Sequence, residues 1–234
     1  MLPLAERFHA IAFDLDGTLV DTAPDLAAAA NAMLKWLGHA PLPESDIAAL
    51  IGHGIERLVG DALARSTGAV ADPAALSRAV TLFRDYYGER LFVQSRVYPG
   101  VLEALKALRA HEVPACCITN KPSAFALRLL EAAGLAAYLR FALCADRVEE
   151  RKPSPRLLLV ASTRLGVAPH ELLYVGDSRS DVEAARAAGC PVALVEYGYR
   201  RSVRLADMGA DWVVGSLAQL LAAPAVRPLE SNVA

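Results

Sequence analysis

Features that would place the chain in a membrane or an oxidising compartment are missing from the sequence. Its 234 residues include only four cysteines, none of them in a CxxC pair. We therefore expect reduced cysteines packed as small hydrophobic residues. No apolar run approaches the roughly 18 residues of a membrane-spanning helix, and the N-terminal segment has no continuous apolar stretch followed by a cleavage site. The sequence predicts a cytoplasmic protein with no membrane partner.

A marked excess of either charge is also missing. There are 24 lysines and arginines against 26 aspartates and glutamates, for a net charge of −2. Nothing therefore draws the whole surface to nucleic acid or anionic lipid. Hydrophobic residues make up 54% and charged residues 21%, which excludes a disordered chain. At roughly 150 residues per domain the length gives about 1.6 domains, hence one large domain or a core with an insert.

Short apolar runs that are separated by helical patterns indicate an α/β protein. Strands that alternate with helices form right-handed βαβ units, so we expect a parallel sheet covered on both faces. The runs that predict strands are Ile11–Phe13, Val113–Thr119, Phe141–Cys144, Leu172–Val175, Pro191–Val195 and Trp212–Val214. The patterns that predict helices are Val101–Ala110, Ser123–Ala133, Pro155–Leu165, Asp181–Ala188 and Ser216–Leu221.

The segment from Thr22 to about Ser95 interrupts this alternation, because it has helical patterns and no convincing strand. We expect an all-helical insert after the first strand. Residues 1–20 and 96–234 would then form the α/β core, and residues 21–95 a helical domain. The predicted helices of the insert are Asp25–Leu37, Ser45–Ile51, Ile55–Ser66 and Pro73–Gln94.

Two carboxylates follow the first predicted strand. Asp14 and Asp16 flank one residue, and residues i and i+2 of a strand face the same way. Gly17 then permits a sharp turn. Ligands of an open parallel sheet bind at the carboxyl ends of its strands. Taken alone, however, this pattern is more typical of an ordinary aspartate turn.

Polar residues also stand at the ends of later strands. Thr119 and Asn120 follow the second strand, Lys152 precedes a helix, and Asp177 lies four residues before Asp181. Taken singly, these are typical of a helix N-cap, a solvated lysine and a capping arrangement.

Taken together, the strand-end residues predict a phosphate site. The four aspartates would converge at one edge of the sheet, where like charges repel and a cation is needed. Oxygen ligands suit Mg²⁺, which prefers a few carboxylates with waters and a substrate phosphate. Lys152 would add a fixed positive charge, and Thr119 and Asn120 neutral donors. Such a site would stabilise the charge on a transferring phosphoryl group.

In order along the chain, these motifs resemble the four motifs of haloacid dehalogenase superfamily phosphatases. The resemblance covers almost the whole chain, with the helical insert matching the cap domain. It implies a Rossmann-like parallel-sheet core with an inserted all-helical cap. The matching segments are Phe13-Asp-Leu-Asp-Gly-Thr-Leu-Val-Asp-Thr22, Thr119-Asn120, Lys152 and Gly176-Asp177-Ser-Arg-Ser-Asp181.

The resemblance implies a role for each of these residues. Asp14 would be the nucleophile that takes the phosphoryl group as an aspartyl-phosphate. Asp16 would protonate the leaving alkoxide and then activate water. Thr119 and the backbone amide of Asn120 would hold phosphate oxygens, and Lys152 would neutralise Asp14 and the phosphate.

The metal ligands are implied in the same way. Mg²⁺ would be held by Asp14, the backbone carbonyl of Asp16 and Asp177, with Asp181 close by through water or the lysine. The implied reaction is Mg²⁺-dependent hydrolysis of a phosphomonoester on a small phosphorylated metabolite.

Single residues disfavour other branches of the superfamily. Asp16 argues against the dehalogenases, which attack carbon and need no acid there. Phosphonatases use a cap lysine, but only Lys35 lies between Thr22 and Ser95. Sugar-phosphate mutases commonly carry a different residue where this chain has Thr18. A phosphatase or mutase for another metabolite, such as a sugar phosphate, stays an alternative, as does a non-catalytic binding protein on the same fold.

Further segments are most similar to bacterial phosphoglycolate phosphatases, which implies the conversion of 2-phosphoglycolate and water to glycolate and phosphate. Such a cap places a glycine-flanked loop over the substrate. We expect His53 and Arg57 of this loop to bind the substrate carboxylate. Ser180 departs from the asparagine of many relatives. Both a monomer and a homodimer stay open. The similar segments are Asp21–Leu26, Ile51–Gly54, Ile118–Pro122 and Val195–Tyr199.

Overall fold

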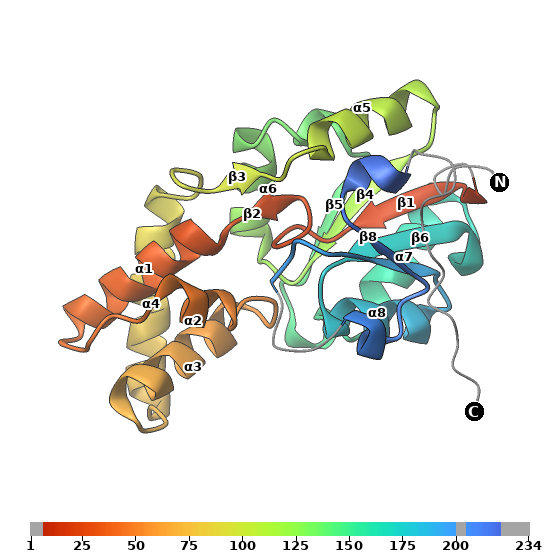
Figure 1. Cartoon of the computed structure of the whole chain (residues 1–234). Helices are drawn as coiled ribbons and strands as arrows, with labels where there is room; N and C mark the ends of the chain where they lie inside the picture. Colours follow the sequence, from red (N-terminus) through yellow and green to blue (C-terminus); the bar gives the residue numbers. More distant parts are fainter. Residues whose placement is uncertain (1–6, 200–204, 221–234) are drawn as a thin grey trace.

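A six-stranded parallel sheet forms one part of the molecule and a group of helices the other (Figure 1). The computed structural model describes residues 7–199 and 205–220. The sheet has the order β5-β4-β1-β6-β7-β8, and all its pairs are parallel. This confirms the predicted α/β fold class. The strands are β1 Ala10–Phe13, β4 Ala115–Thr119, β5 Ala142–Cys144, β6 Leu172–Gly176, β7 Val192–Val195 and β8 Trp212–Val214.

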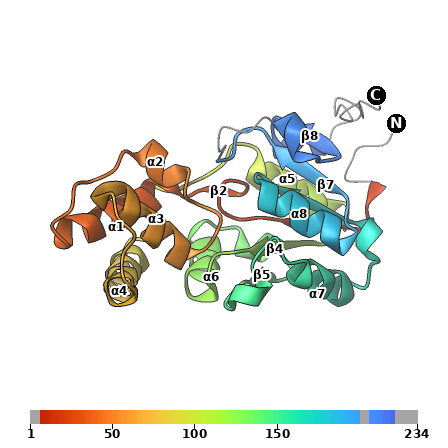
Figure 2. The same ribbon diagram turned by 90° about the horizontal axis from the view of Figure 1, so that it is seen from below.

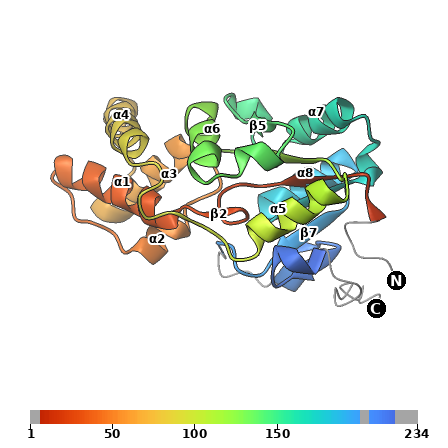
Figure 3. The ribbon, with the colours of Figure 1, turned by 90° about the horizontal axis from the view of Figure 1, so that it is seen from above.

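Helices cover both faces of the sheet, as Figures 2 and 3 show. Ile11 and Phe13 of β1 pack in the layer that contains α5, whereas Ala10 and Ala12 pack in the layer that contains α7 and α8. Both sets are fully buried, which is typical of a parallel sheet between two helical layers. The core helices are α5 Val101–Ala110, α6 Ser123–Ala132, α7 Arg156–Leu165 and α8 Arg179–Ala188.

The helical insert lies between two short strands that pair with each other. β2 (Val20–Asp21) and β3 (Arg96–Val97) form an antiparallel ribbon where the chain leaves and re-enters the core. Within the insert α1 packs on α2 and α4, and α3 packs on α4. No strand was predicted at either end of the insert, because two residues are too few for an alternation pattern. The helices are α1 Ala23–Trp36, α2 Glu44–Ala48, α3 Ile55–Thr67 and α4 Pro73–Glu89.

The last helix of the insert ends earlier than expected. The sequence pattern predicts a helix to Gln94, but α4 ends at Glu89. A buried carboxylate on α1 explains the difference. Asp25 accepts hydrogen bonds from the backbone N–H groups of Val93, Gln94 and Ser95 at 2.9–3.0 Å. These bonds hold the returning chain in an extended turn, which no local pattern could predict.

The remaining elements of the described residues are short 3₁₀ helices. One of them, Leu217–Leu220, lies in the predicted helix Ser216–Leu221, whose last residue is outside the described part of the chain. Among the described residues, no helix has the length and apolar character needed to cross a membrane. The other 3₁₀ helices are Ala136–Tyr138, Val148–Glu150, Pro169–Glu171 and Leu205–Met208.

Candidate active site

A buried lysine joins two aspartates at the carboxyl edge of the sheet. The Nζ atom of Lys152 lies 2.8 Å from Oδ1 of Asp14 and 2.7 Å from Oδ1 of Asp181. Tyr174 also contacts this nitrogen, at 2.9 Å. Burial alone would lower the pKa of Lys152, but the two carboxylates raise it well above its usual value. The lysine therefore stays charged beside Asp14.

The loop that carries Lys152 is held by the end of β4. Oδ1 of Asn120 accepts the backbone N–H of Lys152 at 2.7 Å, and its Nδ2 donates to the backbone carbonyl of Gly52 at 2.8 Å. The Asn120 side chain thus ties the lysine loop and the loop of the insert to the same strand end. Thr119 is buried next to it, and its Oγ1 accepts the N–H of Lys121 at 3.1 Å.

Three buried carboxylates form the centre of the site. One oxygen each of Asp14, Asp177 and Asp181 lies within 4.8 Å of the others. Burial, followed by repulsion from neighbouring carboxylates, raises the pKa of Asp14 to about 7 and that of Asp177 well above its usual value. For Asp181, burial acts to raise the pKa, but Lys152 and the hydrogen bonds from Ser178 together lower it. The cluster has more negative charge than one lysine neutralises, so its donor set fits a divalent metal ion.

The three carboxylates are not equivalent as ligands. Oδ1 of Asp181 faces Lys152, and Oδ2 accepts hydrogen bonds from the backbone of Asp177 and from the backbone and hydroxyl of Ser178. Both of its oxygens are thus engaged within the chain. Among the described residues, a hydrogen bond is made to only one oxygen of the Asp177 side chain, which accepts the N–H of Tyr199 at 2.7 Å. This geometry suits Asp177 to direct metal contact and Asp181 to orienting Lys152 and the loop.

The backbone after β1 passes so close to Asp177 that it requires a glycine at position 17 of the first motif. Gly17 has a φ of +85°, and a Cβ there would collide with the carboxylate of Asp177. The left-handed conformation and the lack of a side chain are both needed here. Gly17 therefore brings the loop after β1 against the loop after β6.

Asp16 points toward a different set of partners. Its Oδ1 accepts the hydroxyl of Thr22 at 2.7 Å and lies 2.9 Å from Nζ of Lys121. It also lines two cavities, of about 190 Å³ and 30 Å³. The larger cavity includes Asp177 and His53, and the smaller one includes Lys121. Asp16 therefore stands between the carboxylate cluster and a small space under the insert.

Comparison with known proteins accounts for this arrangement. Residues 8–189 match the family of haloacid dehalogenase-like hydrolases. This chain belongs to that family. The chain is 47% identical to a phosphoglycolate phosphatase of Nitrosospira multiformis over 208 residues, 89% of this chain and 92% of that protein. It is 45% identical to one of Thiobacillus denitrificans, over 90% and 92% of the two chains.

Solved structures agree with the family assignment. The crystal structure of a predicted phosphoglycolate phosphatase from Haemophilus somnus is similar with a TM-score of 0.86 and 33% identity. The match covers 92% of this hydrolase and 97% of that chain. A putative beta-phosphoglucomutase from Thermotoga maritima is similar with a TM-score of 0.68 and 26% identity, over 91% and 96% of the two chains.

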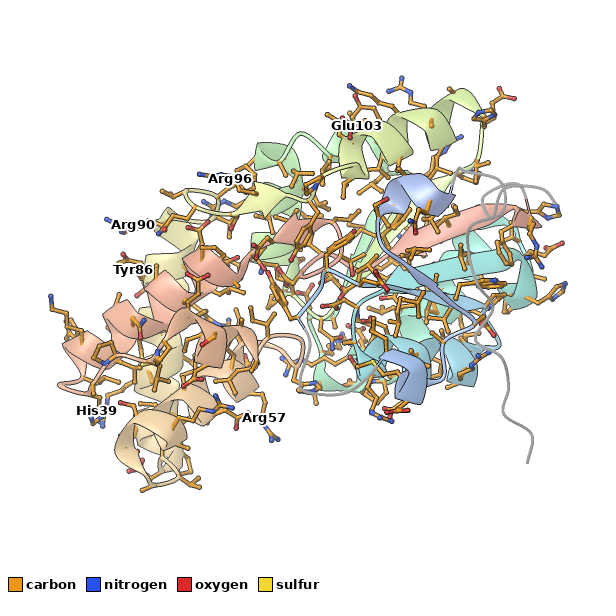
Figure 4. All side chains as sticks on the ribbon, viewed as in Figure 1. His39, Arg57, Tyr86, Arg90, Arg96 and Glu103 are labelled. Atoms are coloured by element: carbon orange, nitrogen blue, oxygen red, sulfur yellow. The ribbon has the colours of Figure 1, made fainter. Side chains whose placement is uncertain are left out.

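The structure separates the two residues of the insert that sequence analysis assigned to substrate. His53 lines the larger cavity of the hydrolase. Arg57 does not reach the site, because its side chain is 68% exposed and pairs with Asp61 one turn along α3. Figure 4 shows it pointing away from the core. The buried face of α3 contains Ile55 and Leu58, and Arg57 lies on the opposite, exposed face. The structure thus does not bring Arg57 together with the other site residues.

Sequence analysis missed Lys121. This lysine lies in Ile118–Pro122, one of the segments that are similar to bacterial phosphoglycolate phosphatases, but the sequence pattern indicates no role for it. In the hydrolase its side chain is 4% exposed, pairs with Asp16, and lies 4.8 Å from the ring centroid of Tyr87 on α4. Burial alone would lower the pKa of Lys121, but Asp16 raises it above its usual value. The signal that could have found it is a lysine that directly follows a strand end carrying site residues.

Proposed function

We propose that this hydrolase is a Mg²⁺-dependent phosphomonoester hydrolase and that 2-phosphoglycolate is its substrate. The observation that carries the proposal is the buried Asp14–Lys152 pair beside Asp177. It provides a carboxylate with a fixed cation on one side and a metal-ligand position on the other. Support for the substrate comes from the relatives, which are named phosphoglycolate phosphatases.

The first half-reaction uses Asp14 as nucleophile. Its carboxylate oxygen attacks phosphorus, a bond to phosphorus forms, and the bond to the glycolate oxygen breaks. Asp16 gives its proton to that leaving oxygen. Lys152 holds Asp14 and balances its charge, while Thr119 and the backbone amide of Asn120 bind phosphoryl oxygens. The products are glycolate and an aspartyl-phosphate.

The second half-reaction restores both aspartates. Asp16, now ionised, takes a proton from water, and the oxygen of that water attacks phosphorus. The bond between phosphorus and Asp14 breaks, which releases phosphate. Asp14 and Asp177 would hold the metal with the backbone carbonyl of Asp16, where a bound Mg²⁺ would offset the charge on the phosphoryl oxygens.

The helical insert, residues 21–95, acts in this proposal as a cap that excludes water. Its loop is held on the core by the Asn120–Gly52 hydrogen bond. A second contact joins Nη2 of Arg151 to Oε2 of Glu56 on α3 at 2.7 Å. These contacts place Gly52 and His53 above the carboxylate cluster.

A substrate panel tests the proposal. Phosphate release is measured for 2-phosphoglycolate, a hexose phosphate and an aryl phosphate, with Mg²⁺ and with a chelator. We expect the highest kcat/KM for 2-phosphoglycolate and no turnover with the chelator. A higher kcat/KM for the hexose phosphate would contradict 2-phosphoglycolate as the substrate. Unchanged rates with the chelator would contradict the dependence on Mg²⁺. Failure on every ester would favour a non-catalytic binding protein.

A further inference from the structure

The small cavity under the cap contains one charged group besides Asp16. It lies between the core and α1 and α3, and Leu26, Ile55 and Leu58 form apolar parts of its wall. Its remaining described lining residues are uncharged except for Lys121. An anion that enters this space without a partner would lose its hydration at a high cost. Lys121 is therefore the group that decides whether an anion can be accommodated there.

Covalent geometry places the carboxylate of phosphoglycolate within reach of this lysine. One methylene separates the ester oxygen from the carboxyl carbon, so the carboxylate oxygens lie within about 4 Å of the ester oxygen. To protonate that oxygen, Asp16 must approach it to about 3 Å. Lys121 lies 2.9 Å from Asp16. A carboxylate that extends from the ester oxygen into the small cavity would then meet Nζ of Lys121.

We propose that Lys121 binds the substrate carboxylate and thereby selects a short acidic leaving group. The inference rests on the proposed function and replaces the role that sequence analysis gave to Arg57. Lys121 and Asp16 are 105 positions apart in sequence. The end of β4 therefore supplies the cation for the substrate carboxylate, and the end of β1 supplies the general acid. The Nζ atom of Lys121 also lies 4.8 Å from the ring centroid of Tyr87 on the cap helix α4, which ties this selection to cap closure.

Two other cationic groups could serve instead, and the larger cavity contains both. His53 and Arg179 line that cavity together with Asp177. His53 is only half-buried and Arg179 is exposed at the first turn of α8, whereas Lys121 is almost fully buried. A buried cation gives a stronger and less screened contact than an exposed one. The geometry therefore favours Lys121.

The test compares a substrate with its uncharged amide. We would measure kcat/KM of the wild type and Lys121→Met for 2-phosphoglycolate and 2-phosphoglycolamide, with exposed Lys106→Met as the control. Loss of one charge-assisted hydrogen bond should lower kcat/KM for the acid roughly 10- to 150-fold more than for the amide. An equal fall for both substrates would overturn the inference, since it would mean that Lys121 acts only through Asp16.

A binding measurement separates this inference from the proposed function. Calorimetry with 3-phosphonopropionate and propylphosphonate, which are not hydrolysed, needs no turnover. The wild type should bind the carboxylate compound more tightly, and Lys121→Met should lose that preference while it still binds propylphosphonate. Equal affinities in the wild type would overturn the inference, as would loss of the preference in His53→Ala or Arg179→Ala but not in Lys121→Met. Failure of the wild type to hydrolyse any ester would instead overturn the proposed function.

Discussion

The Nζ atom of Lys152 lies 2.8 Å from Oδ1 of Asp14, and both side chains are almost fully removed from solvent. The same nitrogen contacts Asp181, so one cation serves two carboxylates. Neither carboxylate can be exposed without moving a strand end or the start of α8. The position of Asp14 is therefore set by the core.

Removal of this cation should be costly for folding. In Lys152→Met two buried carboxylates lose their partner, and a broken buried ion pair costs about 3–5 kcal/mol. We expect urea denaturation of the metal-free protein to show a loss of that order, whereas exposed Lys106→Met should stay within about 0.5 kcal/mol of the wild type. A loss below about 1 kcal/mol for Lys152→Met would show that the pair is not structural.

Asp16→Asn should affect substrates according to their leaving groups. The substitution removes the proton donor but keeps the backbone carbonyl. General acid catalysis contributes roughly 10²–10⁴-fold, so the rate of formation of the phosphoenzyme should fall by that factor for an alkyl phosphate. It should fall far less for a nitrophenyl phosphate, whose leaving group needs little protonation. Rapid-quench measurement of the first turnover gives both rates, and equal losses would contradict an acid role for Asp16.

Metal binding and pH should be linked through the carboxylate cluster. Burial raises the pKa of Asp14 from 3.8 to about 7 and that of Asp177 in the same direction. The folded metal-free state therefore binds more protons than the unfolded state between these values, and its stability falls as pH rises through this window. Mg²⁺ takes the place of these protons.

We therefore expect the increase in Tm on addition of Mg²⁺ to be larger at about pH 7.5 than at about pH 5. Differential scanning fluorimetry across this range, with and without a chelator, measures it. Asp177→Asn should greatly reduce the increase in Tm at both pH values, whereas Asp61→Asn, at a half-exposed position on α3 outside the cluster, should leave it unchanged. An increase in Tm that is independent of pH would contradict metal binding by these carboxylates.

The sequence predicted the parts of the site that depend on the sheet alone. Strand alternation and the common edge of parallel strands are enough to bring Asp14 and Asp177 together, and the structure places them as neighbours. The roles of these residues stay predictions. The adjacent Cys116 and Cys117 follow the same strand alternation, since they lie in opposite core layers.

The cap could not be predicted to the same depth, because its contacts join distant parts of the chain. Arg57 is close to His53 in sequence, but the phase of α3 turns it to solvent. Lys121 pairs with Asp16, which lies 105 positions away in sequence. Asp25 ends α4 by binding a segment about 70 residues later. Such contacts depend on how the insert packs on the core, and a local sequence pattern carries no information about that packing.

The central claim is that Asp14 takes the phosphoryl group, and trapping of the phosphoenzyme tests it most directly. The wild type is mixed with 2-phosphoglycolate that carries a radiolabelled phosphate, in the presence of Mg²⁺, and quenched with acid within the first turnover. We predict label on the peptide that contains Asp14, and neither label nor turnover in Asp14→Asn. Hydrolysis by the wild type with no label on that peptide, or turnover at the wild-type rate in Asp14→Asn, would contradict the account.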